Sequence, residues 1–92
     1  MNMKTYHLSI ITPNGQVFDG EIESLVAPGD AGSFGILARH RAMVSSLKKG
    51  VLKLVQNAQA KFFNLGPGVL EVDGENHVVI LTDEAVENNF TK

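Results

Sequence analysis

The segment Tyr6-His7-Leu8-Ser9-Ile10-Ile11-Thr12-Pro13-Asn14-Gly15 alternates apolar and polar side chains and then supplies turn-forming residues. Successive side chains of a strand point to opposite faces, so Tyr6, Leu8 and Ile10 share one face. The Asn-Gly pair tolerates the positive φ angles of tight hairpin turns. The segment therefore predicts a half-buried strand over Thr5–Thr12 that ends in a turn.

Short apolar runs closed by glycine or turn residues recur along the rest of the chain. One long, bent strand is expected over Gln16–Ala27, with Phe18, Ile22 and Val26 on its inner face. Pro28–Gly35 is expected as an ordered loop because it holds three glycines and a proline. Further strands are expected at Ile36–Leu37, Ala42–Leu47, Val51–Gln56, Lys61–Leu65, Val69–Val72 and His77–Leu81, and Asp83–Lys92 is expected as an edge strand or one helical turn. Eight to ten such strands predict an all-β fold of two packed antiparallel sheets or a barrel.

Length and composition limit the chain to one domain without disulfide cross-links. It has 92 residues, no cysteine and a formal net charge of −2. The absence of cysteine excludes disulfides, thiolate catalysis and Cys-ligated metal sites. The charge balance argues against general attraction to nucleic acid or anionic lipid. No apolar run reaches the roughly 20 residues that span a bilayer.

Motifs that carry enzymatic chemistry are missing. None of the three histidines has a second ligand at the short spacing of a preformed metal site. Glu21 and Glu23 share a strand face, which is typical of a solvated surface. The segment Gly32–Gly35 lacks the glycine that a nucleophile elbow places two positions before its serine. We therefore expect no catalytic residue, cofactor or metal, and we interpret the chain as a binding or structural module.

Charge is distributed unevenly, because no Asp or Glu occurs from Ala31 to Leu70. Two interpretations are open: the flanking strands interleave with the central ones and neutralise them, or the window forms a basic face for an acidic partner. An alternative function uses this window and Phe62-Phe63 as an OB-like module that binds single-stranded nucleic acid. Phe62 and Phe63 point to opposite faces of a strand, so at least one of them belongs to the core. The cations of the window are Arg39, Arg41, Lys48, Lys49, Lys53 and Lys61, with His40.

Several motifs resemble one known family in order and spacing. They are Tyr6-His7-Leu8-Ser9-Ile10-Ile11-Thr12-Pro13, Val17-Phe18-Asp19-Gly20-Glu21-Ile22, Leu25-Val26-Ala27-Pro28-Gly29-Asp30-Ala31-Gly32-Ser33-Phe34-Gly35-Ile36-Leu37, His40, Val44-Ser45-Ser46-Leu47-Lys48-Lys49-Gly50, Gly68-Val69-Leu70-Glu71-Val72 and Val78-Val79-Ile80-Leu81-Thr82-Asp83-Glu84-Ala85. Together they resemble the N-terminal domain of the epsilon subunit of bacterial F-type ATP synthases. The resemblance runs from about Met3 to Val86.

This resemblance implies a ten-stranded antiparallel two-sheet β-sandwich or flattened barrel. It also implies a non-catalytic subunit of the central rotor, which links the gamma subunit to the c-ring and supports the coupling of ion flow to ATP synthesis. Such a subunit lies peripherally on the cytoplasmic face of the bacterial inner membrane. It meets the membrane only through the c-ring, and it binds no cofactor, metal or nucleic acid.

The resemblance also implies two sets of contact residues. The turn expected to face the c-ring comprises Asp30, Ala31, Gly32, Ser33 and Phe34, with Ser33 at a position that is usually acidic. The edge expected to face gamma comprises Thr12, His40 and Met43, with Arg41 beside them. Ala38-Arg39 replaces the usual Pro-Gly before the histidine.

The family's domain pattern gives the last expectation. Residues 1–87 are expected as the sandwich domain and residues 88–92 as a tail. The C-terminal helical hairpin of most members is expected to be absent, because 86–92 cannot form two helices. We therefore expect neither ATP binding nor helix-mediated inhibition from this polypeptide.

Overall fold

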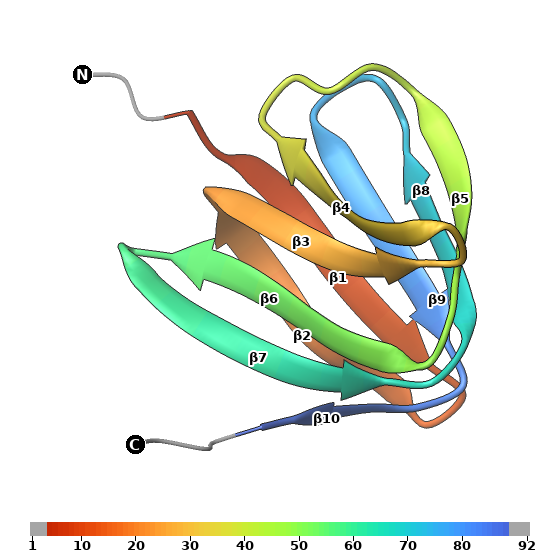
Figure 1. Ribbon diagram of the computed structural model, residues 1–92. Helices are drawn as coiled ribbons and strands as arrows, with labels where there is room; N and C mark the ends of the chain where they lie inside the picture. Colours follow the sequence, from red (N-terminus) through yellow and green to blue (C-terminus); the bar gives the residue numbers. More distant parts are fainter. Residues whose placement is uncertain (1–3, 89–92) are drawn as a thin grey trace.

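The computed structural model describes residues 4–88, which form ten β-strands and no helix (Figure 1). The expected tail therefore lies, apart from residue 88, outside the described residues. Alternating side chains and turns rich in glycine and asparagine account for this all-β content. The strands are β1 (Tyr6–Thr12), β2 (Gly15–Ile22), β3 (Ser24–Gly29), β4 (Gly32–Leu37), β5 (Met43–Leu47), β6 (Gly50–Gln56), β7 (Gln59–Leu65), β8 (Gly68–Val72), β9 (His77–Thr82) and β10 (Ala85–Glu87).

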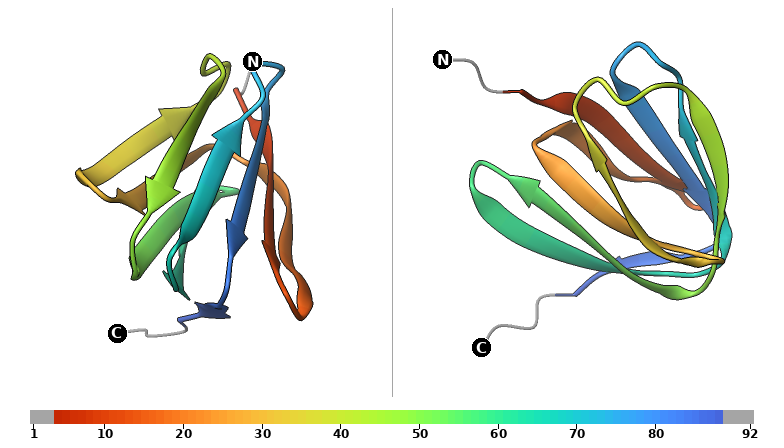
Figure 2. Two further views of the ribbon diagram at one scale, coloured as in Figure 1. Left: turned by 90° about the vertical axis from the view of Figure 1, so that its right-hand side faces the viewer. Right: turned by 45° about the horizontal axis from the view of Figure 1, so that its top comes forward.

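The strands form one continuous sheet that curls into a flattened, nearly closed barrel (Figure 2). Its order is β10-β7-β6-β3-β5-β8-β9-β1-β2, and β4 pairs with β3 beside this path. We call β5, β8, β9, β1 and β2 the β1 wall, and β4, β3, β6, β7 and β10 the β3 wall. The predicted β-sandwich or flattened barrel is confirmed.

One strand pair departs from the antiparallel expectation. β1 and β9 pair in parallel, from His7 opposite His77 to Ile11 opposite Leu81. Both strands run toward the same end of the barrel, and an antiparallel pairing would need one more chain reversal between them. The parallel pair joins the first strand of the chain to the last long one and so completes the β1 wall.

The core lies between the two walls and consists of inward-facing aliphatic and aromatic residues. Tyr6, Leu8 and Ile10 are buried in it, which confirms the face predicted for the first strand. The phenol of Tyr6 donates a 2.6 Å hydrogen bond to the carbonyl of Ile36, so β1 is tied directly to β4 of the opposite wall. The other buried core residues are Ile22, Leu25, Ala27, Ile36, Leu47, Leu52, Leu54, Phe63, Leu65, Leu70, Val72, Val78 and Ile80.

The long strand expected over Gln16–Ala27 is divided at Glu23. β2 ends at Ile22 and β3 begins at Ser24, and the amide of Glu23 donates to the carbonyl of Val55 on β6. This corner shifts the alternation of inward and outward side chains by one residue. Leu25 is therefore buried, and Val26 is 42% exposed. The prediction that Val26 faces inward is therefore wrong, because the alternation does not continue through the corner.

The expected loop over Pro28–Gly35 is a hairpin. β3 and β4 pair continuously from Ser24 opposite Leu37 to Gly29 opposite Gly32, with Asp30-Ala31 as the turn. The three glycines of this segment were interpreted as loop residues, but all three occupy strand positions. The expected edge strand near the C-terminus is present as β10, which pairs with β7.

Candidate docking surfaces

The five residues expected to face the c-ring lie together at the tip of the β3–β4 hairpin. Asp30, Ala31, Gly32 and Ser33 are exposed, and Phe34 is partly buried against the core. Gly32 has a φ of 127°, a conformation that favours glycine. The tip therefore presents small side chains and accessible backbone groups.

The tip is braced by the neighbouring turn between β5 and β6. The amide of Asp30 donates to the carbonyl of Ser46 at 3.3 Å, and the amide of Lys48 donates to the carbonyl of Pro28 at 2.9 Å. A Cβ on Gly29 would lie 2.7 Å from the ring of Phe34, so only glycine lets Phe34 fold back over the hairpin. These contacts fix the tip relative to the barrel.

His40 and Arg41 lie in the loop between β4 and β5, at the opposite end of β5 from the hairpin tip. The Nδ1 atom of His40 lies 2.7 Å from the carbonyl oxygen of Arg41. The amide of Arg39 donates to the side-chain oxygen of Asn76, whose amide nitrogen donates to the carbonyl of Thr5. The loop is thus held against the β8–β9 turn and the start of β1.

Arg39 has a φ of 66°, the left-handed conformation that glycine adopts most easily. It stands where the resembled family usually has glycine. The backbone therefore keeps a glycine-like turn although the side chain has changed, and an exposed cation is added beside His40.

The structure does not bring all four expected gamma contacts together. Thr12 ends β1 at the barrel end where β9 also ends. Met43 begins β5 at the other end, opposite Val72, and packs partly buried against the core. His40, Arg41 and Met43 therefore lie near one another, whereas Thr12 lies apart from them.

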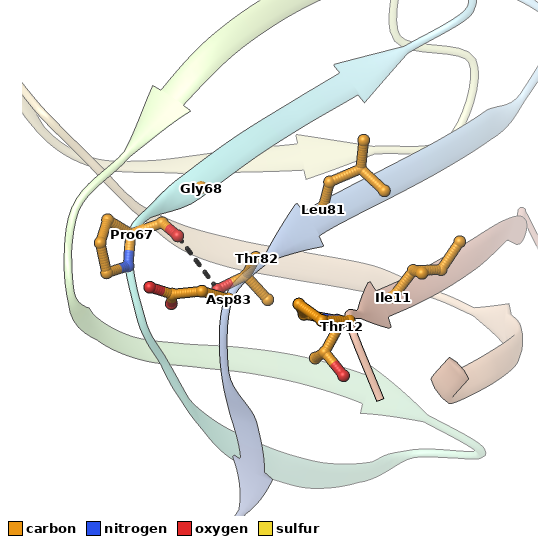
Figure 3. Close-up of a pocket in the computed structure, with 8 residues that line it drawn as sticks. Ile11, Thr12, Pro67, Gly68, Leu81, Thr82 and Asp83 are labelled. Atoms are coloured by element: carbon orange, nitrogen blue, oxygen red, sulfur yellow. Dashed lines mark hydrogen bonds between the residues drawn. The ribbon is translucent and has the colours of Figure 1, made fainter. Parts of the chain in front are cut away.

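Thr12 instead lines an open hollow of about 420 Å³ on the β1 wall (Figure 3). The hydroxyl of Thr82 donates to the carbonyl of Gly66 at 2.9 Å, and this contact orders the β7–β8 turn beside the hollow. The hollow has an apolar floor and one carboxylate at its rim. Its lining is Ile11, Thr12, Pro13, Pro67, Gly68, Leu81, Thr82 and Asp83.

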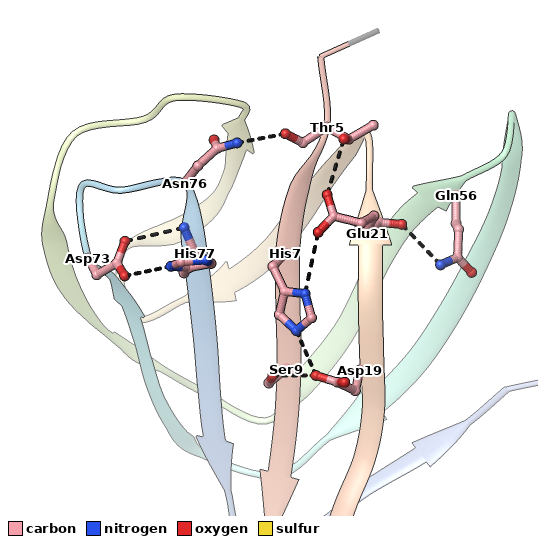
Figure 4. A network of polar contacts seen from close by, with 9 residues as sticks. All are labelled: Thr5, His7, Ser9, Asp19, Glu21, Gln56, Asp73, Asn76 and His77. Atoms are coloured by element: carbon pink, nitrogen blue, oxygen red, sulfur yellow. Dashed lines mark hydrogen bonds and ion pairs between the residues drawn. The ribbon is translucent and has the colours of Figure 1, made fainter.

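A polar network covers the outer face of β1 and β2 (Figure 4). The Nε2 atom of His7 lies 2.7 Å from the carboxylate of Asp19, and its Nδ1 atom lies 3.4 Å from that of Glu21. The hydroxyl of Ser9 also donates to Asp19. The hydrogen bond to Asp19 raises the pKa of His7, and the hydrogen bonds from Ser9 and His7 lower the pKa of Asp19.

A second histidine lies beside this network on β9. The rings of His7 and His77 meet edge to face, with centroids 6.1 Å apart. The Nδ1 atom of His77 lies 3.0 Å from the carboxylate of Asp73. The backbone amides of Glu75 and His77 also donate to Asp73, and the amide of Glu75 contributes most to lowering its pKa. Over residues 4–88 no group of three or more His, Asp or Glu side chains is arranged to hold a metal ion.

The acid-free window of the sequence is interrupted in space by a flanking strand. β3, which carries no charge, lies between β6 and β5. Acidic residues of the flanks also lie beside the window, because Asp83 and Glu84 line one hollow with Lys49. Flanking segments therefore interleave with the window, as the first interpretation expects. The window is not one basic face, since Arg39 and Arg41 lie at one end of β5 and Lys48 and Lys49 at the other.

Within the described part of the chain, no helix is long and apolar enough to cross a membrane. The sequence pattern of the ATP synthase delta/epsilon chain β-sandwich domain matches residues 5–88. The ATP synthase epsilon chain of Helicobacter acinonychis is 39% identical over 84 residues, which cover 91% of this chain and 68% of the relative. The chain belongs to the ATP synthase delta/epsilon family.

Other members of this family differ in length. The epsilon chain of Caulobacter vibrioides is 34% identical over 85 residues, which cover 92% of this chain and 98% of the relative. That of Campylobacter curvus is 40% identical, with coverage of 91% of this chain and 65% of the relative. The chain thus spans about two thirds of the Helicobacter and Campylobacter members and nearly all of the Caulobacter member.

Chains of two solved mitochondrial ATP synthase structures share the fold. A chain of the Euglena gracilis mitochondrial ATP synthase superposes with a TM-score of 0.86 at 20% identity and covers 95% of this chain and 56% of its own length. A chain of the Tetrahymena thermophila mitochondrial ATP synthase central stalk and c-ring superposes with a TM-score of 0.76 at 21% identity, covering 99% and 78%. These likenesses show the fold, and the family match over residues 5–88 is to a β-sandwich domain.

Sequence reasoning missed the clustering of His7, Asp19 and Glu21. Part of the signal was present, because all three residues fall on the polar faces of their strands. The exact pairing, residue 7 opposite 21 and residue 9 opposite 19, depends on a bulge between Ile10 and Ile11 that the turn alone does not predict. The histidines were considered only as metal ligands at short spacing in the sequence. A cross-strand search would have found the cluster.

Proposed function

We propose that this chain is the non-catalytic epsilon-type subunit of an F-type ATP synthase rotor, joining the gamma subunit to the c-ring. In this role it supports the coupling of ion flow to ATP synthesis. The observation that carries the proposal is the family match over residues 5–88, nearly the whole described chain. The subunit needs a stiff body and two binding surfaces, one for each partner, rather than a reactive group.

The geometry supports a spacer with contacts at both ends of one strand. The hairpin tip lies beside Leu47 at the end of β5, and the His40 loop leads into Met43 at its start. Four residue steps of strand separate these points by about 13 Å. Between these points β5 is hydrogen-bonded into the sheet and lies over the close-packed core. A force applied at one binding surface therefore reaches the other with little deformation.

We assign the hairpin tip, Asp30–Phe34, to the c-ring and the His40 loop to gamma. The tip offers backbone groups and small side chains, which suits docking by shape and hydrogen bonding. The loop offers Arg41 and partly buried His40. Thr12 is assigned to gamma only through the apolar hollow that it lines, a separate contact from the loop.

The proposed location is the cytoplasmic face of the bacterial inner membrane, reached through the c-ring alone. The nucleic-acid alternative receives no support from the family comparisons. Phe63 is buried in the core, and only Phe62 of the pair is exposed, so the two do not form a stacking platform.

The first test separates the two binding surfaces by charge reversal. His40→Glu with Arg41→Glu should weaken gamma binding about tenfold or more, because charged groups facing a partner set complementarity. Lys48→Glu with Lys49→Glu is the matched control: it makes the same kind of change beside the hairpin tip, and we expect it to keep gamma affinity. Affinity for purified gamma is measured by calorimetry, and folding by circular dichroism. A folded His40/Arg41 variant that binds gamma as tightly as the wild type removes the assignment.

A further inference from the structure

The turn between β8 and β9 holds the His40 loop, residues 38–42, through one side chain. The backbone amide of Arg39 donates to the Oδ1 atom of Asn76 at 2.7 Å. Within residues 4–88 this is the only hydrogen bond that joins the loop to another segment, because the contact of His40 with the carbonyl of Arg41 stays inside the loop. The position of the loop therefore depends on where Asn76 holds its side-chain oxygen.

The carboxamide of Asn76 is also fixed on its other side (Figure 4). Its nitrogen donates to the carbonyl of Thr5 at 2.8 Å, just before β1 begins. The backbone carbonyl of Asn76 accepts a hydrogen bond of 3.1 Å from the amide of His7 on β1. A carboxamide has one acceptor and one donor group, and here each has its partner. Asn76 thus bridges the first strand of the chain and the His40 loop.

The turn itself sets the direction of this side chain. The backbone of Asn76 has a φ of 70°, a left-handed conformation that asparagine adopts more readily than most residues. A carboxylate oxygen of Asp73 accepts hydrogen bonds from the amides of Glu75 and His77, the residues on either side of Asn76. Such Asx-type bonds stabilise a turn locally. The turn is therefore ordered by its own contacts, and the side chain of Asn76 remains available for the bridge.

A second contact joins the same turn to the other end of the loop. A Cβ on Gly74 would lie 3.3 Å from the Cβ of Ala42, so the backbone of the turn packs closely against the end of the loop. Asn76 holds the loop at Arg39, and Gly74 packs against it at Ala42. The two residues between these points, His40 and Arg41, are the ones assigned to gamma.

We propose that Asn76 is a positioning residue for gamma binding, whose carboxamide holds the His40 loop in the conformation that gamma recognises. This inference rests on the proposed function and adds to it a residue outside the assigned contacts. Without the bridge, the loop loses its hydrogen bond to the barrel. Gamma must then order the loop as it binds, and this ordering lowers the affinity.

The test removes the side chain without straining the backbone. Asn76→Gly suits the left-handed φ and deletes both side-chain hydrogen bonds. It should weaken gamma binding about fivefold or more. Asn57→Gly is the matched control, because Asn57 also has a left-handed φ, of 53°, and lies in the exposed turn between β6 and β7. Its side chain makes no hydrogen bond within residues 4–88. Asn57→Gly should keep gamma affinity within about twofold of the wild type.

Two further measurements separate positioning from general stability. Amide hydrogen exchange at Arg39 should become faster in Asn76→Gly and stay unchanged in Asn57→Gly. Asn76→Gly is also combined with His40→Glu and Arg41→Glu, which remove the contacts that the loop makes. In this background Asn76→Gly should reduce affinity by less than about twofold, because residues that act through one another are not additive. Calorimetry gives the affinities, and thermal unfolding confirms that each variant is folded.

The outcomes distinguish this inference from the proposed function. If the folded wild type does not bind gamma, the proposed function is overturned and the inference falls with it. If the wild type binds gamma and folded Asn76→Gly binds equally well, the inference alone is overturned. The inference is also overturned if Asn57→Gly weakens binding as much as Asn76→Gly, or if the full loss persists in the His40/Arg41 background.

Discussion

The two walls of the barrel have similar inner faces, and their outer faces differ chiefly in charge. Both contribute leucine, isoleucine and valine to the core. Outside, the β1 wall carries His7, Asp19 and Glu21 joined across two strands, whereas the β3 wall carries Val26, Phe62 and a single cation. Alternation fixes the inner residues because the core must be filled, while the outer residues remain free to differ. The difference between the walls therefore lies in their outer faces.

The largest expected effect contrasts one glycine from each wall. A Cβ on Gly68 would lie 2.1 Å from the carbonyl oxygen of Leu81 and 2.8 Å from the Cα of Thr82, so Gly68→Ala forces β8 and β9 apart. We expect a loss of about 3 kcal/mol in the free energy of unfolding. Gly35 on the β3 wall faces only the carbonyl of Leu25 at 3.6 Å. Gly35→Ala should be neutral or stabilise by up to about 1 kcal/mol.

Urea unfolding of the two variants measures this contrast directly. If Gly68→Ala is as stable as Gly35→Ala, the close approach of β8 and β9 does not constrain the β1 wall. Equal and large losses in both variants would show that the outer position of Gly35 is not open.

The sequence was sufficient for the inner faces, because alternation over uninterrupted strands reports them directly. It predicted the burial of Tyr6, Leu8 and Ile10. It failed at Val26 because Glu23 turns a corner through a hydrogen bond to Val55, a contact made by a residue far along the chain. It also interpreted Gly32–Gly35, the first part of β4, as loop, because glycine in a strand looks the same as glycine in a turn until the pairing partner is known.

The candidate sites were predictable only where their residues are consecutive. Asp30–Phe34 lie together because they belong to one hairpin. Thr12 and Met43 were grouped through resemblance alone, and the sheet order places them at opposite ends of the barrel. The contact between Arg39 and Asn76 joins two turns that lie 37 residues apart in the sequence, so no local pattern specifies it.

An intermediate effect is expected where the two walls are tied together. Tyr6 on β1 donates to the carbonyl of Ile36 on β4, and burial raises the pKa of Tyr6, so the phenol stays protonated and able to donate at neutral pH. Tyr6→Phe keeps the ring in the core and leaves a buried carbonyl without its donor. The cost should be about 1–2 kcal/mol in the free energy of unfolding.

Amide hydrogen exchange shows which strands the substitution loosens. Faster exchange in β4 of Tyr6→Phe, with β7 unchanged, is the expected pattern, since the lost contact holds β4 to the opposite wall. A uniform change over both walls would mean that the phenol contributes to general packing and is not a specific tie.

The smallest expected effect is the pH dependence of the polar network on the β1 wall. Only the protonated ring of His7 can donate to Asp19 and Glu21 together, because a neutral imidazole has one N–H. Its pKa is raised above 6.5, chiefly by the hydrogen bond to Asp19, so its contribution is fully present below 6.5 and disappears as pH rises through the folded-state value. The pKa of Asp19 is lowered below 3.8, so its own contribution is present above 3.8 and is lost as pH falls through the lower folded-state value. Both contributions to the stability are therefore present between pH 3.8 and pH 6.5.

His7→Asn tests this window against the wild type. The His7 side chain is 35% exposed, so solvent screening limits its contribution to well under about 1 kcal/mol. The stability difference should be present at about pH 5.5 and absent by about pH 8.5. His77 lies beside His7 and contacts Asp73, so a second histidine titrates close by. The titration of His7 is therefore followed by NMR in both the wild type and Asp19→Asn. We expect Asp19→Asn to lower the pKa of His7. A stability difference that is the same at both pH values would mean that His7 acts through packing and not through its charge, and would remove the electrostatic distinction between the two walls at this position.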